Sequence, residues 1–224
     1  MSEWLQLNAS DGFQLSAYRA NPQGVPKARG AVVVVQEIFG VNGHIRSVCD
    51  GFAADGYVAV APALFDRQQR NFETGYTQED MAAGRELKAK AAIDAAMLDV
   101  AAAREAVADA GRVGIVGYCW GGFVTWMSAA RVPGFACAVS YYGGGIVEAG
   151  KEQPKCPVMA HFGERDAAIP IAGARQFAKD HPAVQVFTYD AEHGFNCDQR
   201  KSYNPAAAKL ARERTIDFLR KHVG

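Results

Sequence analysis

The sequence predicts an α/β fold in which a mostly parallel central sheet is flanked by helices. Six segments are rich in β-branched and aromatic residues, and they are continuously apolar, as strands buried on both faces of a sheet are. Helical patterns separate these segments, and strands that alternate with helices form parallel βαβ units. The six expected strands are residues 31–36, 57–61, 112–116, 135–141, 157–162 and 184–189.

Residues 13–18, FQLSAY, differ from those six segments because apolar and polar positions alternate. Alternation is typical of a strand with one exposed face, so we expect an edge strand here. Between the second and third buried strands, apolar residues recur every three or four positions from Leu87 to Ala102. This spacing predicts one alanine-rich helix with an apolar stripe.

Three further helices follow later strands. Residues 123–131 have a helical pattern directly after the third buried strand, and another helix is expected after Pro170. The last residues of the chain again have an apolar position every three or four residues, and Asn204-Pro205 is a typical N-cap and first-turn pair for this helix. Function in such folds sits at the carboxyl ends of the strands, which is where candidate catalytic residues are expected.

Composition excludes several classes of protein. The 224 residues are 49% hydrophobic and 21% charged, which is ordinary globular usage, and with no linker or repeat we expect one domain over 1–224. Lys and Arg number 24, as do Asp and Glu, which argues against a nucleic-acid or membrane-surface partner. With no membrane-spanning run or signal pattern, we expect a cytoplasmic monomer or weak homo-oligomer. The five cysteines have no C-x-x-C spacing, which argues against a zinc ribbon.

The strongest chemical signal is the segment 117–122, GYCWGG, which joins an expected strand to an expected helix. It has the G-x-C-x-G spacing of a nucleophile elbow, with Cys119 in the nucleophile position. Such a sharp turn strains the middle residue, and its neighbours two positions away must lack side chains. The turn also directs the helix N-terminus at the sulfur, which favours the thiolate. A buried structural cysteine in a glycine-rich turn is the alternative.

A cysteine nucleophile needs a base, and the base needs an orienting acid. In proteins with such an elbow, the chain order is nucleophile, acid and histidine. Asp166 and His193 each follow an expected strand and complete that order. Glu164 and Asp190 remain alternatives for the acid. His161 lies inside an expected strand and is interpreted as a packed core histidine.

The first buried strand ends in the loop 36–42, QEIFGVN. In proteins with such an elbow, this loop donates one oxyanion-hole N–H, here that of Ile38, and the residue after the nucleophile, Trp120, donates the other. Glu37 is unusual because an acid directly after a buried strand is at least partly buried and needs a partner. The thiol of Cys119 and an arginine are the candidate partners, and an ion-paired structural glutamate is the alternative role.

These motifs together resemble the dienelactone hydrolase family of α/β-hydrolases. The resemblance implies a compact, lidless α/β-hydrolase fold, a triad of Cys119, Asp166 and His193, and a Glu37 that lies near the resting thiol and helps control its ionisation. It implies neither a cofactor nor a metal. It spans nearly the whole chain and rests on QEIFGVN, on the elbow, on Gly163 through Asp166 and on His193-Gly194-Phe195.

By that resemblance, the reaction is hydrolysis of a dienelactone (a carboxymethylenebutenolide) to maleylacetate during the breakdown of aromatic compounds. The thiolate of Cys119 attacks the lactone carbonyl, the oxyanion rests on the amides of Ile38 and Trp120, and ring opening leaves a thioester. His193, oriented by Asp166, then activates the water that hydrolyses this thioester.

One departure from the family pattern concerns the grip on the substrate carboxylate. Dienelactone hydrolases hold it with two arginines, one of them four residues after the catalytic histidine, where this chain has Cys197. Arg200 is a candidate substitute, and Arg85 is a candidate for the second arginine. Because losing an arginine–carboxylate contact changes specificity more than chemistry, two alternatives remain. They are a hydrolase of other small esters, lactones or thioesters, and a non-catalytic thiol sensor. Phe39 and Phe195 are further candidates for the substrate pocket.

Overall fold

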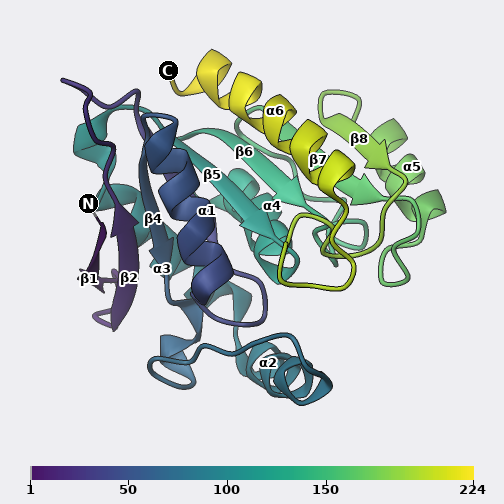
Figure 1. The fold of residues 1–224 in the computed structure, drawn as a ribbon, viewed down its shortest axis with the longest axis horizontal. Coiled ribbons are helices and arrows are strands. Elements are labelled where there is room, and N and C mark those ends of the chain that lie inside the picture. The colour runs from purple at the N-terminus through teal and green to yellow at the C-terminus, as the bar shows by residue number, and fades with distance from the viewer. Residues whose placement is uncertain (1) are drawn as a thin grey trace.

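The computed structural model describes residues 2–224 and has strands and helices that alternate along most of the chain (Figure 1). The strands are β1 (Ser2–Asn8), β2 (Gln14–Ala20), β3 (Ala31–Val35), β4 (Val58–Pro62), β5 (Val113–Tyr118), β6 (Phe135–Tyr141), β7 (Val158–Gly163) and β8 (Gln185–Tyr189). The helices are α1 (Gly43–Ala54), α2 (Gln78–Lys90), α3 (Ile93–Glu105), α4 (Trp120–Arg131), α5 (Ile171–Asp180) and α6 (Pro205–His222), with short 3-10 turns η1 (Leu64–Arg67) and η2 (Ala108–Ala110).

Among residues 2–224, the strands form one sheet in the order β1-β2-β4-β3-β5-β6-β7-β8. β2 runs antiparallel to both β1 and β4, and every pair from β4 to β8 is parallel. α1 and α6 cover the near face of the sheet in Figure 1, and α3 and α4 pack together behind it. The mostly parallel α/β sheet expected from the sequence is therefore confirmed. No helix of the described residues is long and apolar enough to cross a bilayer.

The central strands β3, β4 and β5 are buried at every position. Because helices cover both faces of the sheet, these strands have no exposed side, and their sequences are therefore continuously apolar. The prediction of an edge strand at 13–18 is wrong in its position, because β1 pairs with β2 and forms the edge. β1 is mostly exposed, so it carries too few apolar residues to be recognised from hydrophobic patterning.

The single alanine-rich helix expected from Leu87 to Ala102 is also wrong. The chain forms two helices, α2 and α3, and the backbone is extended at Ala91 and Ala92 between them. Alanine favours helix on both sides of this break, and no glycine or proline marks it. The expected cap of the last helix is confirmed, since the side chain of Asn204 accepts from the amide of Ala207.

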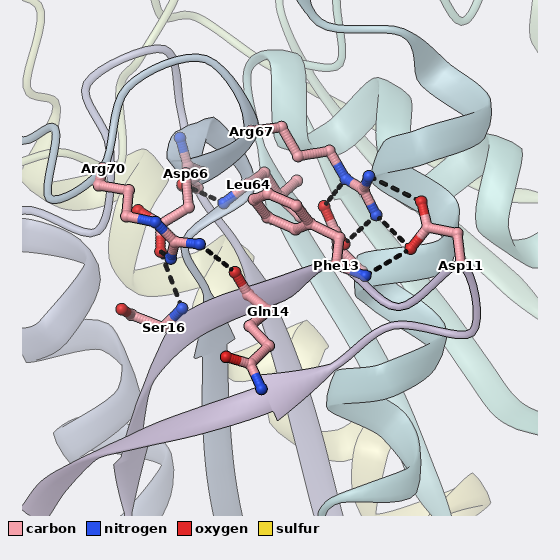
Figure 2. A network of polar contacts seen from close by, with 10 residues as sticks. Asp11, Phe13, Gln14, Ser16, Leu64, Asp66, Arg67 and Arg70 are labelled. Carbon is pink, nitrogen blue, oxygen red and sulfur yellow. Dashed lines mark hydrogen bonds and ion pairs between the residues drawn. The ribbon is translucent and has the colours of Figure 1, made fainter.

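A polar network fastens the β1–β2 hairpin to the loop after β4 (Figure 2). The guanidinium of Arg67 donates to both oxygens of Asp99, each at 2.8 Å, and to both oxygens of Asp11 at 2.8 and 3.1 Å. Burial raises the pKa of Asp99, and Arg67 opposes this shift. Asp66 adds a second tie, since it accepts from the amide of Ser16 at 2.8 Å. Because Asp99 is fully buried, losing Arg67 would leave an uncompensated charge inside the protein.

The strand order has a topological switch point at the centre of the sheet. β3 and β5 are neighbours, but the chain leaves β3 toward β4 on one side and leaves β5 toward β6 on the other. The loops at their carboxyl ends therefore diverge, and α/β sheets bind ligands at such a switch point. The loop 36–42 follows β3, and Cys119 follows β5.

Candidate active site

Cys119 occupies a sharp turn between β5 and α4. Its backbone has φ 54° and ψ −119°, a conformation that residues with side chains rarely adopt. A Cβ atom on Gly117 would lie 2.1 Å from the carbonyl oxygen of Gly121, and one on Gly121 would lie 2.3 Å from that of Val35. The turn therefore requires glycine at both positions, as the elbow spacing predicts.

The turn places the partly exposed Cys119 side chain at the N-terminus of α4. The carbonyl of Cys119 accepts from the amide of Gly122 at 2.9 Å, and its own amide donates to Tyr141 at 3.0 Å. The position of the sulfur is thus set by backbone contacts on both sides. Free N–H groups and the dipole at a helix N-terminus stabilise a thiolate.

Asp166 and His193 form the acid–base pair expected from chain order. Nδ1 of His193 donates to Oδ2 of Asp166 at 2.7 Å. The other carboxylate oxygen accepts from the amides of Ala168 at 2.8 Å and Ile169 at 3.1 Å, and Asp166 is only 5% exposed. These bonds fix the carboxylate, which in turn fixes the imidazole and directs Nε2 away from Asp166.

The alternative acids point elsewhere. Glu164 accepts from the hydroxyl of Thr188 at 2.7 Å, and the exposed carboxylate of Asp190 pairs with Arg165 at 3.2 Å. His161 is a core histidine, as expected: it is fully buried and bonded on Nδ1 and Nε2, and burial lowers its pKa to about 3.

The pKa of His193 depends on its interactions with Asp166 and Cys119. Burial lowers the pKa of His193, but the charge of the Cys119 thiolate and hydrogen bonds to Asp166 and Cys119 outweigh it and raise the pKa to about 10. The imidazolium form of His193 is therefore favoured by a negative charge on Cys119 and by the hydrogen bond to Asp166.

This shift predicts how stability depends on pH. Because the pKa of folded His193 lies above the unfolded value of about 6.5, its stabilisation is complete below that pH and is lost as the pH rises toward 10. We expect the difference in unfolding free energy between wild type and His193→Gln to shrink over this range in urea titrations. His222→Gln is the control, and its difference should be constant above pH 7.5. If the difference for His193→Gln stayed constant over this range, it would contradict the raised pKa of His193 in the folded protein.

The loop after β3 carries Ile38, whose N–H is one of the two expected oxyanion-hole donors. The other is the N–H of Trp120. The side chain of Gln36 donates to the carbonyl of Glu37 at 3.2 Å and accepts from the amide of Leu64 at 3.1 Å. These two bonds hold the peptide group between Glu37 and Ile38 in place, and with it the N–H of Ile38. On the far side, a Cβ atom on Gly84 of α2 would lie 2.2 Å from the carbonyl oxygen of Ile38. Sequence reasoning gave neither Gln36 nor Gly84 a role, since neither contact leaves a local sequence signal.

Trp120 and Ile38 are both buried beside the elbow. The indole of Trp120 stacks on Phe65 with ring centroids 4.9 Å apart, which anchors the first residue of α4. In the described chain, neither the amide of Ile38 nor that of Trp120 donates to another backbone group in a turn, loop or cap. Both N–H groups can therefore serve an oxyanion.

Glu37 has an arginine as its partner. One carboxylate oxygen is 3.2 Å from the guanidinium of Arg200, and the other accepts from the hydroxyl of Tyr76 at 3.4 Å. Glu37 is 1% exposed, and within residues 2–224 no hydrogen bond joins it to Cys119. Burial lowers the pKa of Arg200, but the charges of Glu37 and Cys119 raise it overall. Arg200 therefore links Glu37 electrostatically to Cys119.

The four candidate substrate-binding residues lie in different places. Arg200 lies over the rings of Phe39 and Tyr76, at 5.8 and 6.0 Å from their centroids, and lines a cavity of about 800 Å³. Phe195 is fully buried and packs edge-on against Tyr142, beneath His193. Arg85 is exposed on α2 and makes no ion pair with the described residues. The structure thus brings Arg200 and Phe39 together and leaves Arg85 and Phe195 outside that group.

Comparison with known proteins gives consistent matches over the full fold. The model of the dienelactone hydrolase family matches residues 15–223. A Synechocystis sp. protein provisionally named a carboxymethylenebutenolidase is 38% identical, over 89% of this chain and 88% of its own. The carboxymethylenebutenolidase of Pseudomonas putida is 34% identical, over 98% and 96%. A crystal structure from Klebsiella pneumoniae, provisionally named a dienelactone hydrolase, has a TM-score of 0.84 and 30% identity, over 97% of this chain and 98% of its own.

Proposed function

This chain belongs to the dienelactone hydrolase family and is a hydrolase of the lactone and ester class, and we propose that it uses Cys119 as a nucleophile to open dienelactones through a thioester. The observation that carries this proposal is the strained elbow that holds Cys119 at a helix N-terminus beside the His193–Asp166 pair. Small esters, other lactones and thioesters are the alternative substrates.

In the proposed reaction, the thiolate of Cys119 adds to the lactone carbonyl, and the amides of Ile38 and Trp120 stabilise the oxyanion. Collapse of this intermediate breaks the ring C–O bond, leaves a thioester and releases the ring oxygen as an enolate, which takes the proton of the His193 imidazolium and leaves the imidazole neutral. His193 then removes a proton from water, whose oxygen attacks the thioester and frees the thiolate. The product of dienelactone opening is maleylacetate, which would place the enzyme in aromatic-compound breakdown in the cytoplasm.

The partly exposed guanidinium of Arg200 supports an acidic substrate. Arg200 lies at the edge of the cavity with its side chain 17% exposed, so a substrate carboxylate can reach it. We propose that Glu37 acts on the site through Arg200, because Arg200 is the charged side chain that pairs with it. Arg200 would then bind the substrate carboxylate, in place of the arginine that the family pattern has at the position of Cys197.

The function is tested by measuring the loss of dienelactone absorbance beside hydrolysis of a neutral aryl acetate. We expect faster turnover of the dienelactone, and Arg200→Gln should lower its kcat/KM by roughly 10- to 100-fold, since a charge-assisted bond contributes about 1.5–3 kcal/mol. The same change should lower aryl acetate hydrolysis by a smaller factor, because that substrate has no carboxylate. Any effect of Arg200 through Glu37 or Cys119 applies to both substrates, so the ratio of the two losses measures the contact with the carboxylate.

Lys201→Gln is the matched control, because Lys201 lines the same cavity without contacting Glu37. Equal losses in both variants would mean that general positive charge, rather than Arg200, attracts the substrate. Arg85→Gln tests the second candidate arginine in the same assay. Brisk aryl acetate hydrolysis with slow dienelactone turnover in the wild type would favour the small-ester alternative.

A further inference from the structure

Glu37, His44 and Cys197 form a buried cluster behind the candidate active site. A carboxylate oxygen of Glu37, an imidazole nitrogen of His44 and the sulfur of Cys197 lie within 4.8 Å of one another. The three residues are 1%, 4% and 0% exposed. They come from the loop after β3, the first turn of α1 and the loop between β8 and α6. The fold thus brings three metal-binding groups together from distant parts of the sequence.

His44 has the arrangement of a metal-ligating histidine. Its Nε2 is buried and has no hydrogen-bond partner among the described residues, although a buried polar atom normally has one. Its Nδ1 lies 3.6 Å from a carboxylate oxygen of Asp198. Histidines that bind metals commonly direct one nitrogen at the ion and the other at a carboxylate, which fixes the ring. The unpartnered nitrogen therefore points to a ligand.

The donor set indicates which ion would fit. A carboxylate and a thiolate carry two negative charges, which balance a divalent cation, and imidazole adds a neutral ligand. Sulfur and nitrogen ligands favour zinc over magnesium or calcium, which prefer oxygen. In a tetrahedral zinc site, ligand atoms lie roughly 3.3–3.8 Å apart, so the three atoms need to close by only about 1 Å.

A cavity reaches one member of the cluster, His44. It has a volume of about 280 Å³ and is also lined by Asn196 and Asp198 of the loop between β8 and α6. We propose that Glu37, His44 and Cys197 form a binding site for zinc or a cation of similar chemistry, with water as a fourth ligand. Cys197 is the position at which the sequence departs from the family pattern, and an arginine there could not serve as a ligand.

An occupied site would be coupled to the candidate active site. Glu37 also pairs with Arg200, so a divalent cation would compete with Arg200 for the same carboxylate. The ion would therefore change the charge that Arg200 presents to the cavity and to Cys119. This makes the cluster a regulatory site, since the proposed reaction does not need a metal there.

The test uses cobalt(II) as a spectroscopic probe in a Cys119→Ser background, which removes the other sulfur that lies beside a histidine. We expect one equivalent of cobalt to give an absorption band from thiolate-to-cobalt charge transfer. The band should disappear when Cys197→Ser is added, and His44→Gln should weaken cobalt binding at least tenfold. Cys156→Ser, which changes a partly buried cysteine outside the cluster, should leave the band intact. Circular dichroism would verify that each variant is folded.

Absence of the band with excess cobalt, or a band that survives Cys197→Ser, would overturn the proposal. A second measurement does not depend on spectroscopy: zinc should raise the thermal unfolding midpoint of Cys119→Ser but not of Cys119→Ser/Cys197→Ser. Equal midpoint shifts in the two proteins would also contradict the site. Neither experiment involves hydrolysis, so the outcome is independent of the proposed function.

Discussion

Replacing Cys119 with alanine is expected to lower kcat for dienelactone and aryl acetate by on the order of 10⁴-fold or more. Without the sulfur, no thioester can form. The oxyanion donors and His193 are still present, but they cannot replace the nucleophile. Loss of both activities together distinguishes this result from a change in substrate binding. The measurement is steady-state kinetics on purified protein with both substrates.

The control for this experiment is Cys156→Ala, which changes a cysteine outside the site and should retain activity within about twofold of wild type. Thermal unfolding of both variants would verify that they are folded. If Cys119→Ala retained a rate within tenfold of wild type, another residue would have to be the nucleophile, and the elbow would have a purely structural role.

Replacing Gly121 with alanine is expected to destabilise the protein by about 3–5 kcal/mol, which is the range of severe overpacking and strain. The added Cβ would lie 2.3 Å from the carbonyl oxygen of Val35 and 2.4 Å from that of Gln36. Both are backbone atoms at the carboxyl end of the central strand β3, where Val35 pairs with Gly117 of β5. The measurement is the free energy of unfolding from urea titrations.

Gly144→Ala is the matched control for this substitution. A Cβ atom on Gly144 would have no other atom within 4 Å, and the backbone there does not require a positive φ, so this change should stay within about 0.5 kcal/mol. A similar small change for Gly121→Ala would mean that the elbow can relax, and packing would then not be what fixes its geometry.

The sequence predicts the parts of this fold whose signals are local. The elbow and the acid follow β5 and β7, which are buried throughout as expected from their apolar sequences. The histidine follows β8, where the expectation of a strand buried on both faces is wrong, because β8 forms an edge of the sheet and only Tyr189 in it is buried. β1 was missed because an exposed edge strand has little hydrophobic signal, and the break between α2 and α3 was missed because alanine favours helix on both sides.

Contacts between distant segments could not be predicted in the same way. The ion pair of Glu37 with Arg200 joins residues 163 positions apart, and the sequence left an arginine and the Cys119 thiol as equal candidates. His44 belonged to no motif, and only the packing of α1 brings it to Glu37 and Cys197. Such contacts depend on how loops from different strands pack together, and no periodic pattern in the sequence predicts that packing.

The close approach of α2 to the loop 36–42 has a consequence for protein engineering. A glycine within a helix is a common target for stabilisation, because alanine at such a position gains up to about 1 kcal/mol in helix propensity. Gly84 meets that criterion, yet its missing side chain is what lets the carbonyl of Ile38 fit against the helix. A thermostabilised variant chosen by helix propensity alone would therefore include a substitution that displaces the backbone of Ile38. Libraries built on this scaffold should keep glycine at position 84.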